Sequence, residues 1–170
     1  MENCLKWPVC GGKIIHSKDS DYLGSISRAV YQFAAEHGQG DELKERYNRV
    51  LDGKEIDYAE AGFFAMVGNI LVGGITYHIH FGWVYLHCGY VWEQYRGIGV
   101  YSALMQAIEA EARNNGLSGI WVCTYEFEAP AVYEHMGFTK GSILTNCPKG
   151  NTSIDYYKDF GKEVDHGQNL

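Results

Sequence analysis

Proline, long apolar segments and positive charge are all scarce in this sequence of 170 residues. It has 3 prolines, and 14 lysines and arginines stand against 21 aspartates and glutamates, which gives a net charge of −7. Such a charge repels phosphate backbones, so we expect no nucleic-acid partner. No segment approaches the roughly 18 consecutive apolar residues of a membrane-spanning helix, and no cationic stretch precedes an apolar run at the start. We therefore expect a cytoplasmic protein that does not bind membranes.

Linkers, internal repeats and an even set of cysteines are absent as well. No Ser/Gly-rich or charged stretch divides the chain, which predicts a single domain over residues 1–170 with mobile ends at 1–12 and 161–170. The five cysteines are odd in number and scattered. A chain of this size does not need disulfides to fold, so we expect free thiols.

The sequence does contain enough apolar and aromatic residues for a folded core. Hydrophobic residues make up 46% of the chain and aromatic residues 14%, which excludes disorder as its main state. Apolar residues at helical spacing predict helices, and alternating or continuous apolar runs predict strands. The expected helices are 21–37, 41–53, 99–115 and 129–136, and the expected strands are 13–16, 63–67, 70–72, 75–80, 83–91, 119–124, 138–145 and 153–157.

Three histidines cluster on the two central strands. Strict alternation places His78, His80 and His87 on one strand face, whereas Ile75, Leu86, Cys88 and Tyr90 share the other. A tight turn at residues 81–82 would put His78 opposite Tyr85 and Thr76 opposite His87. The histidine-rich face is therefore a candidate site face. The histidine spacing also fits a metal site, but no cysteine or carboxylate completes it locally, and we expect no metal.

A glycine-rich turn precedes the strongest expected helix. It reads Gln94-Tyr95-Arg96-Gly97-Ile98-Gly99 and fits the pattern Gln/Arg-x-x-Gly-x-Gly/Ala. An ordinary glycine-containing turn would also fit this loose pattern. Glycines here expose backbone N–H groups, and the following helix presents the positive end of its dipole. A pyrophosphate is the ligand that such a turn favours.

A second signature follows at residues 129–138, which read Ala-Pro-Ala-Val-Tyr-Glu-His-Met-Gly-Phe. In this order, with a long helix and a buried strand between them, the two signatures resemble those of the GNAT acetyltransferase superfamily. The resemblance implies an α/β (α+β) fold: a mixed, mostly antiparallel sheet of about six to seven strands, about four flanking helices, and a splay between the fourth and fifth strands. It further implies an N-acetyltransferase that uses acetyl-CoA as co-substrate.

The resemblance also implies where acetyl-CoA lies, namely along the end of the fourth strand and on the glycine-rich turn. Two positions depart from the family pattern, because Tyr101 stands where the family often has glycine and Glu126 where it often has asparagine. Contacts made by that asparagine are not carried over. The implied acetyl-CoA-binding residues are Tyr90, Val91, Gln94, Tyr95, Arg96, Gly97, Ile98, Gly99, Val100, Tyr101, Ser102 and Tyr133.

Amide formation needs an acid for the departing thiolate and a base for the attacking amine. The resemblance assigns the acid to Tyr133 and gives the Val91 N–H the task of polarising the thioester carbonyl. For the base, His87 is the first candidate, because an ordinary imidazole pKa of about 6.5 suits proton transfer at neutral pH. Strict alternation also places His87 on the strand face of Val91. Alternative bases are Glu126, Glu128, Tyr85 and water.

The acceptor is the least defined part of the prediction. Net charge and acidic residues around the expected cleft (Asp57, Glu60, Glu126 and Glu128) favour an amine such as a polyamine, an aminoglycoside-like compound or a lysine side chain. We expect acetyl transfer to a primary amine of a small molecule by direct attack through a tetrahedral intermediate. An acyl-CoA-binding module without turnover and a protein or peptide lysine acetyltransferase are the alternatives, and a homodimer is one option for the assembly.

Overall fold

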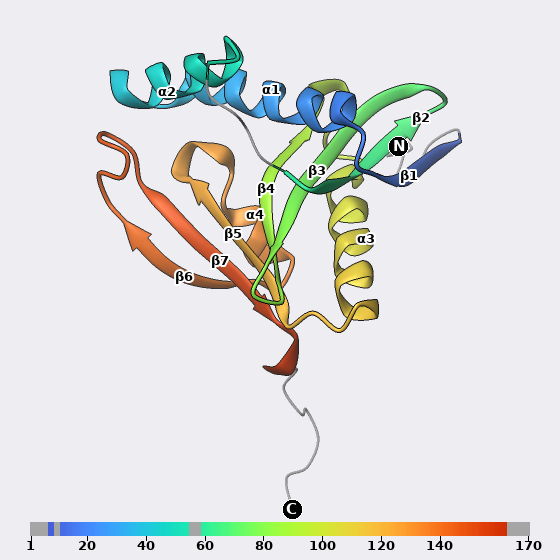
Figure 1. Cartoon of the computed structure of the whole chain (residues 1–170). Helices are drawn as coiled ribbons and strands as arrows, with labels where there is room; N and C mark the ends of the chain where they lie inside the picture. The colour runs from blue at the N-terminus through green and yellow to red at the C-terminus, as the bar shows by residue number, and fades with distance from the viewer. Residues whose placement is uncertain (1–6, 9–10, 55–58, 163–170) are drawn as a thin grey trace, which may run out of the picture.

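Seven strands form one mixed sheet in the computed structural model, which describes residues 7–8, 11–54 and 59–162 (Figure 1). Their order is β1-β2-β3-β4-β5-β7-β6. Neighbours are antiparallel except β4 and β5, which are parallel. This confirms the predicted mostly antiparallel sheet. The strands are β1 (Gly12–Ser17), β2 (Ala61–Val67), β3 (Ile70–His80), β4 (Trp83–Val91), β5 (Gly119–Tyr125), β6 (Thr139–Leu144) and β7 (Ser153–Asp159).

The α-helices of the described residues cover both faces of this sheet. Helix α1 packs on β2, β3 and β4, and α2 packs on α1, whereas α3 packs on the opposite face (Figure 1). The side chain of Asp19 caps α1 by accepting a hydrogen bond from the Asp21 N–H. The helices are α1 (Ser20–His37), α2 (Asp41–Leu51), α3 (Val100–Asn114) and α4 (Ala131–His135).

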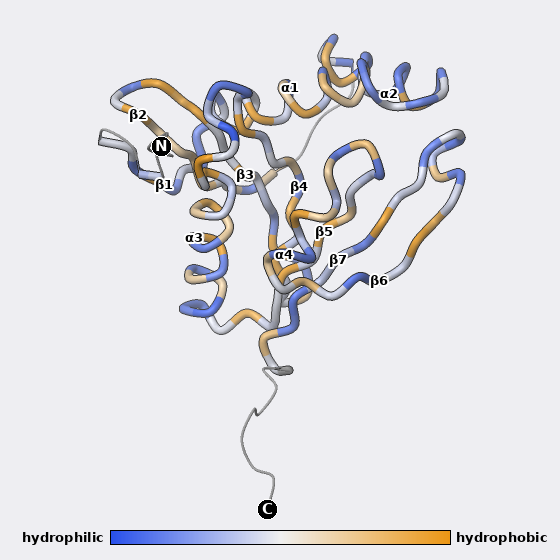
Figure 2. Tube along the Cα trace, turned by 180° about the vertical axis from the view of Figure 1, so that it is seen from behind, coloured by the Kyte–Doolittle hydropathy of each residue, from blue (hydrophilic) through white to orange (hydrophobic). Residues whose placement is uncertain are grey.

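The apolar run of β2 explains why helices cover both faces. Phe63 and Ala65 join the core beneath α3, while Phe64 and Met66 join the core beneath α1. A strand buried on both sides needs continuous rather than alternating apolar residues. Figure 2 shows β2 as mostly hydrophobic and α2 as mostly hydrophilic. The sheet is therefore the central layer of the fold.

Strands β4 and β5 separate along their length, as the resemblance implied. They pair only from Trp83 with Gly119 to Leu86 with Val122, although β4 continues to Val91 and β5 to Tyr125. Figure 1 shows the two strands diverging toward α1 and α2. Beyond residue 86, no strand of the described residues therefore lies beside this edge of β4.

A β-bulge in β4 changes the expected faces. His78 pairs with Tyr85 as predicted, but Thr76 pairs with Cys88 and not with His87. The extra residue in β4 resets the alternation. Cys88 and Tyr90 consequently pack on the α1 side, while Val91 packs on the α3 side. The predicted Thr76–His87 pair, the face given to Cys88 and Tyr90, and the shared face of His87 and Val91 were wrong, because strict alternation does not continue through a bulge.

The predicted mobile ends lie largely among residues 1–6, 9–10 and 163–170, outside the described residues. Two described positions show how the chain approaches the sheet. The Trp7 N–H donates a hydrogen bond to the Ile98 carbonyl at 2.6 Å, and Gly12 begins β1. Trp7 thus contacts the glycine-rich turn.

Candidate active site

A cavity of about 320 Å³ lies where β4 and β5 separate. The end of β4 supplies one wall, and β5 with the following turn supplies the other. Helices α1 and α3 each contribute one residue and α4 contributes two, so segments far apart in the sequence meet here. The lining residues are Phe33, Ile75, Leu86, His87, Cys88, Gly89, Tyr90, Val91, Arg96, Tyr101, Val122, Cys123, Thr124, Phe127, Glu128, Ala129, Val132 and Tyr133.

The glycine-rich turn at the start of α3 has the geometry of an anion cradle. Gly97 and Gly99 have φ values of 75° and 93°, which residues other than glycine rarely adopt. A Cβ on Gly97 would meet no atom within 4 Å, so it would project into open space above the turn. Gly99 is the N-cap of α3 and supplies no capping side chain, which leaves N–H groups of the first turn available to a ligand. These features fit a pyrophosphate.

The turn is held in place by its apolar and basic members. Tyr95 and Ile98 pack against the core beneath α3. Arg96 Nε–H donates to the Val91 carbonyl at 2.9 Å, and the guanidinium carbon lies 5.3 Å from the centre of the Tyr90 ring. Arg96 thus joins the turn to the end of β4.

The remaining predicted acetyl-CoA contacts differ in what they can offer. Gln94 and Ser102 are exposed. The Val100 side chain is only 2% exposed and belongs to the core, so only its backbone can face a ligand. Since the N–H and C=O of one strand residue point to the same side, the Val91 N–H faces the opening together with the carbonyl that binds Arg96.

Two tyrosines meet at the base of the cavity. Tyr133 Oη and Tyr101 Oη lie 2.9 Å apart, and Tyr133 is 8% exposed. The Tyr101 hydroxyl would also lie 2.9 Å from a Cβ on Gly89. Burial raises the pKa of Tyr101 to about 12, and burial, followed by the neighbouring Tyr101, holds the pKa of Tyr133 well above its ordinary value. Both phenols therefore stay protonated at neutral pH.

The β4 bulge turns His87 into the cavity. Its Nε2 lies 3.3 Å from the Tyr31 hydroxyl on α1, and its ring centre lies 6.2 Å from that of His78. Burial, followed by repulsion from His87, lowers the pKa of His78. His87 thus lines the same cavity as Tyr133 and Glu128.

The candidate carboxylates separate into one inside the cavity and others outside it. Glu128 lines the cavity and accepts hydrogen bonds from the Thr124 hydroxyl at 2.9 Å and the Tyr125 N–H at 3.1 Å. Burial raises its pKa. Because Glu128 turns back onto β5 across a 3₁₀ turn, Glu126 at the other end of that turn is exposed and does not line the cavity. The structure therefore brings Glu128 to Tyr133 and His87, and it leaves Glu126 outside.

The structure places one further acidic residue of the expected cleft outside the cavity lining, and it does not describe the other. Glu60 is exposed, and its carboxylate accepts a hydrogen bond from the Ile79 N–H at 3.2 Å, away from the cavity. Asp57 lies outside the described residues.

Sequence reasoning missed the aromatic residues that enter the site from α1. Phe33 lines the cavity and Tyr31 contacts His87. The two residues stand two positions apart, which places them on different sides of α1, and no local signal tells a site residue from a core residue on this helix.

Over the described residues, no group of three or more histidine, cysteine, aspartate or glutamate side chains could hold a metal ion. Within the same ranges, no helix is long and apolar enough to cross a membrane. Cys88, Cys123 and Cys147 are free thiols.

Comparisons with known proteins agree with this geometry. Residues 25–138 match the acetyltransferase (GNAT) family. The chain is 38% identical over 92 residues to Acetyltransferase Atu2258 of Agrobacterium fabrum, covering 54% of this chain and 67% of that protein. It is 33% identical over 84 residues to blasticidin-S acetyltransferase of Streptomyces morookaense, covering 49% and 62%. The chain thus spans about two thirds of the length of these relatives. The crystal structure of Ard1 from Thermoplasma volcanium has a TM-score of 0.64 at 19% identity, covering 88% of this chain and 97% of that one.

Proposed function

The chain belongs to the acetyltransferase (GNAT) family, and from this premise we propose that it transfers the acetyl group of acetyl-CoA to a primary amine of a small molecule. The observation that carries this proposal is a convergence on one cavity. The glycine-rich turn leads into it through Arg96, the free edge of β4 forms one wall, and the buried phenol of Tyr133 lies at its base. These are the parts that thioester aminolysis requires.

Acetyl-CoA binding follows from the turn and the strand edge. The N–H groups around Gly97 and Gly99 would hold the pyrophosphate at the positive end of α3. The part of acetyl-CoA that carries the thioester would then lie along β4 as an added strand. This register brings the thioester carbonyl to the Val91 N–H, which stabilises the oxyanion of the tetrahedral intermediate.

Tyr133 acts as the acid in this proposal. When the intermediate collapses, the C–S bond breaks and the phenol gives its proton to the departing thiolate. The Tyr101 hydroxyl, 2.9 Å away, can then donate a hydrogen bond to the phenolate oxygen of Tyr133. The family position that often holds glycine therefore supplies, in this chain, a partner for the acid.

The attacking amine must be neutral, so a base has to remove a proton. His87 is our first choice because the bulge turns it into the cavity. Glu128 is the second, since burial raises the pKa of this carboxyl and thereby increases its proton affinity. Glu126 would act only on the approach of the acceptor, because it lies outside the cavity lining.

The choice of a small molecule as acceptor is supported by one relative. Blasticidin-S acetyltransferase is, by its name, an enzyme for a small molecule, and 84 of its residues align with this chain at 33% identity. A cavity of about 320 Å³ is also of the size that small ligands occupy.

The experiment is a screen of a few hundred amines, amino acids, antibiotics and peptides with acetyl-CoA, read by the release of free thiol and by the mass of the acetylated product. We expect at least one small amine to gain one acetyl group with matching thiol release. Acetyl-CoA binding without turnover of any acceptor would instead favour a binding module, and turnover of peptides alone would favour a lysine acetyltransferase.

A further inference from the structure

The α1 side of β5 and β7 forms a polar and aromatic surface beside the cavity. Trp121 pairs with Tyr157, and Cys123 pairs with Asp155. Residues that pair across antiparallel strands point to the same face. Tyr85 of β4 lies beside Trp121 in the parallel pairing. We call the surface of these five side chains the arm groove.

Two aromatic rings form one wall of the arm groove. Trp121 is 39% exposed although it lies in the middle of a strand. Its ring centre is 4.8 Å from that of Tyr85, at an interplanar angle of 62°. Burial raises the pKa of Tyr85 to about 12, so its phenol stays neutral. An exposed indole next to a neutral phenol offers π-faces that attract a cation.

Asp155 supplies a carboxylate in the same groove. It is half-buried, accepts a hydrogen bond from the Ser142 hydroxyl and hydrogen-bonds the Cys123 side chain. Burial, followed by the charge of Asp155, raises the pKa of the Cys123 thiol to about 12, so this thiol is neutral. Across the part of the chain that the structure describes, no lysine, arginine or histidine forms an ion pair with Asp155. A half-buried carboxylate without a cation favours a cationic ligand.

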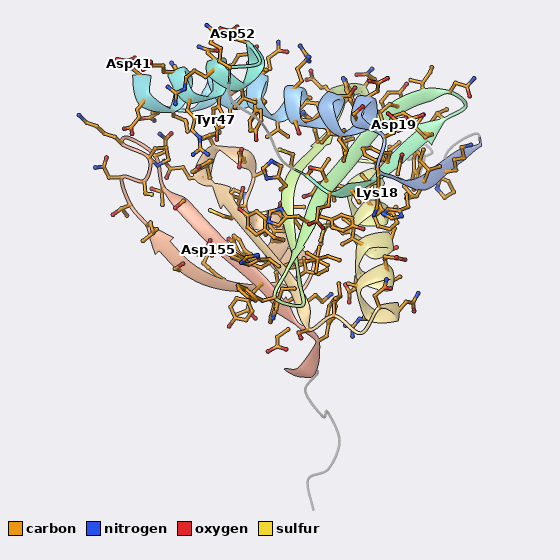
Figure 3. The ribbon with its side chains drawn as sticks, in the orientation of Figure 1. Lys18, Asp19, Asp41, Tyr47, Asp52 and Asp155 are labelled. Atoms are coloured by element: carbon orange, nitrogen blue, oxygen red, sulfur yellow. The ribbon has the colours of Figure 1, made fainter. Side chains whose placement is uncertain are left out.

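The arm groove joins the acetyl-transfer cavity through Cys123. That residue lines the cavity and pairs directly with Asp155 on the neighbouring strand. Figure 3 shows Asp155 on β7 and Tyr47 on the side of α2 that faces the sheet. Adjacent strands are about 4.8 Å apart, so a ligand would need to span roughly one to two strand spacings between the cavity and the carboxylate.

We propose that the acceptor carries a second group that stays cationic at neutral pH, and that Asp155, Trp121 and Tyr85 bind this group while the amine to be acetylated lies in the cavity. The inference rests on the proposed function. In this proposal the acceptor has two nitrogen groups with different charges during the reaction. The attacking nitrogen loses its proton to the base, whereas the distant ammonium or guanidinium stays charged and orients the molecule. Diamines and amino-guanidines have this chemistry.

The test uses pairs of amines with and without a second cationic group: agmatine against pentylamine, and 1,4-diaminobutane against butylamine. We expect kcat/KM to be at least about tenfold higher for the dications. Asp155→Asn should remove most of this preference by lowering kcat/KM for the dications about tenfold, while the values for the monoamines and the KM for acetyl-CoA stay unchanged. Trp121→Leu should lower the dication values several-fold.

The matched control is Asp52→Asn, which changes the net charge by the same amount. Asp52 lies just after α2, next to Lys54 at 3.0 Å, and is exposed (Figure 3). We expect this variant to retain the full dication preference. Thermal unfolding of each variant would show whether the fold is kept, and Trp121→Leu remains informative if Asp155→Asn does not fold.

Calorimetric titration of agmatine into the protein saturated with CoA separates this inference from the proposed function. Agmatine binding that Asp155→Asn weakens about tenfold supports the groove even if no amine is acetylated, an outcome that would count against the proposed function alone. Equal kcat/KM and equal affinity for dications and monoamines, or equal losses in Asp155→Asn and Asp52→Asn, would overturn the inference.

Discussion

The two walls of the opening are built in different ways. The β4 wall and the glycine-rich turn present mainly backbone groups from one stretch of sequence, residues 89–102, to which Tyr133 adds a phenol. The other wall continues through Cys123 into the arm groove, whose side chains, among them Trp121 and Asp155, meet only because their strands pair. The backbone wall suits the acetyl-CoA that the proposed function places there. The side-chain wall suits the cationic acceptor proposed above, because its carboxylate and aromatic rings can bind a positive charge.

The largest expected effect comes from Gly97→Val, which breaks the backbone wall. The new side chain would occupy the open space above the turn and strain a backbone with a φ of 75°. We expect acetyl-CoA affinity, measured by calorimetry, to fall roughly a hundredfold. Gly68→Val is the control, since Gly68 also has a positive φ and open space but lies in the β2–β3 turn. Unchanged affinity in a folded Gly97→Val protein would remove the turn from acetyl-CoA binding.

Next in size is Tyr133→Phe, which keeps the ring of the acid and deletes its proton. Because the phenol would act only in the breakdown of the intermediate, kcat should fall roughly tenfold to several-hundredfold, with little change in acetyl-CoA affinity. Steady-state kinetics and calorimetry measure the two quantities. Full activity in this variant would exclude Tyr133 as the acid.

A smaller loss of kcat is expected for Tyr101→Phe. This variant tests whether Tyr101, which stands where the family often has glycine, supports Tyr133 as the acid. Loss of the 2.9 Å contact with Tyr133 should lower kcat about three- to tenfold. Since the two hydroxyls act as a pair, the double variant with Tyr133→Phe should be no slower than Tyr133→Phe alone. Additive losses would show that Tyr101 acts independently of Tyr133.

A change of pH profile is expected for His87→Ala. If His87 is the base, kcat/KM of the wild type falls on the acidic side as the imidazole gains a proton. The variant should lose this acidic limb. An unaltered limb would show that another group is the base. Glu128→Gln would then test the buried carboxyl, because burial raises its pKa and protonation of this carboxylate at low pH would also reduce kcat/KM.

The smallest effect should come from Glu126→Gln. Glu126 is exposed and outside the cavity lining, and exposed charges interact weakly with ligands. We expect the acceptor KM to rise less than about twofold, and the acetyl-CoA KM to stay constant. If Glu126→Gln weakened acceptor binding as much as Asp155→Asn, the main carboxylate for the cationic acceptor would be Glu126 and not Asp155.

The same difference between the walls explains how much could be predicted from the sequence. The order of elements and the turn at Gly97 and Gly99 follow from short patterns, since turns and helix starts depend on neighbouring residues, whereas the splay was expected only from the family resemblance. The bulge at His87 did not follow, because register depends on the partner strand. The inward Glu128 and outward Glu126 depend on a single 3₁₀ turn. No local sequence pattern marks Asp155 as a site residue, because its place beside the cavity depends on the pairing of its strand with Cys123 in β5.

A crystal structure of the dead-end complex with CoA and agmatine tests the account of the two walls most directly. We predict the pyrophosphate on the N–H groups around Gly97 and Gly99, the CoA sulfur within hydrogen-bonding reach of Tyr133 Oη, and the guanidinium of agmatine on the carboxylate of Asp155. A CoA sulfur remote from Tyr133, or a guanidinium bound away from the carboxylate of Asp155, would contradict it.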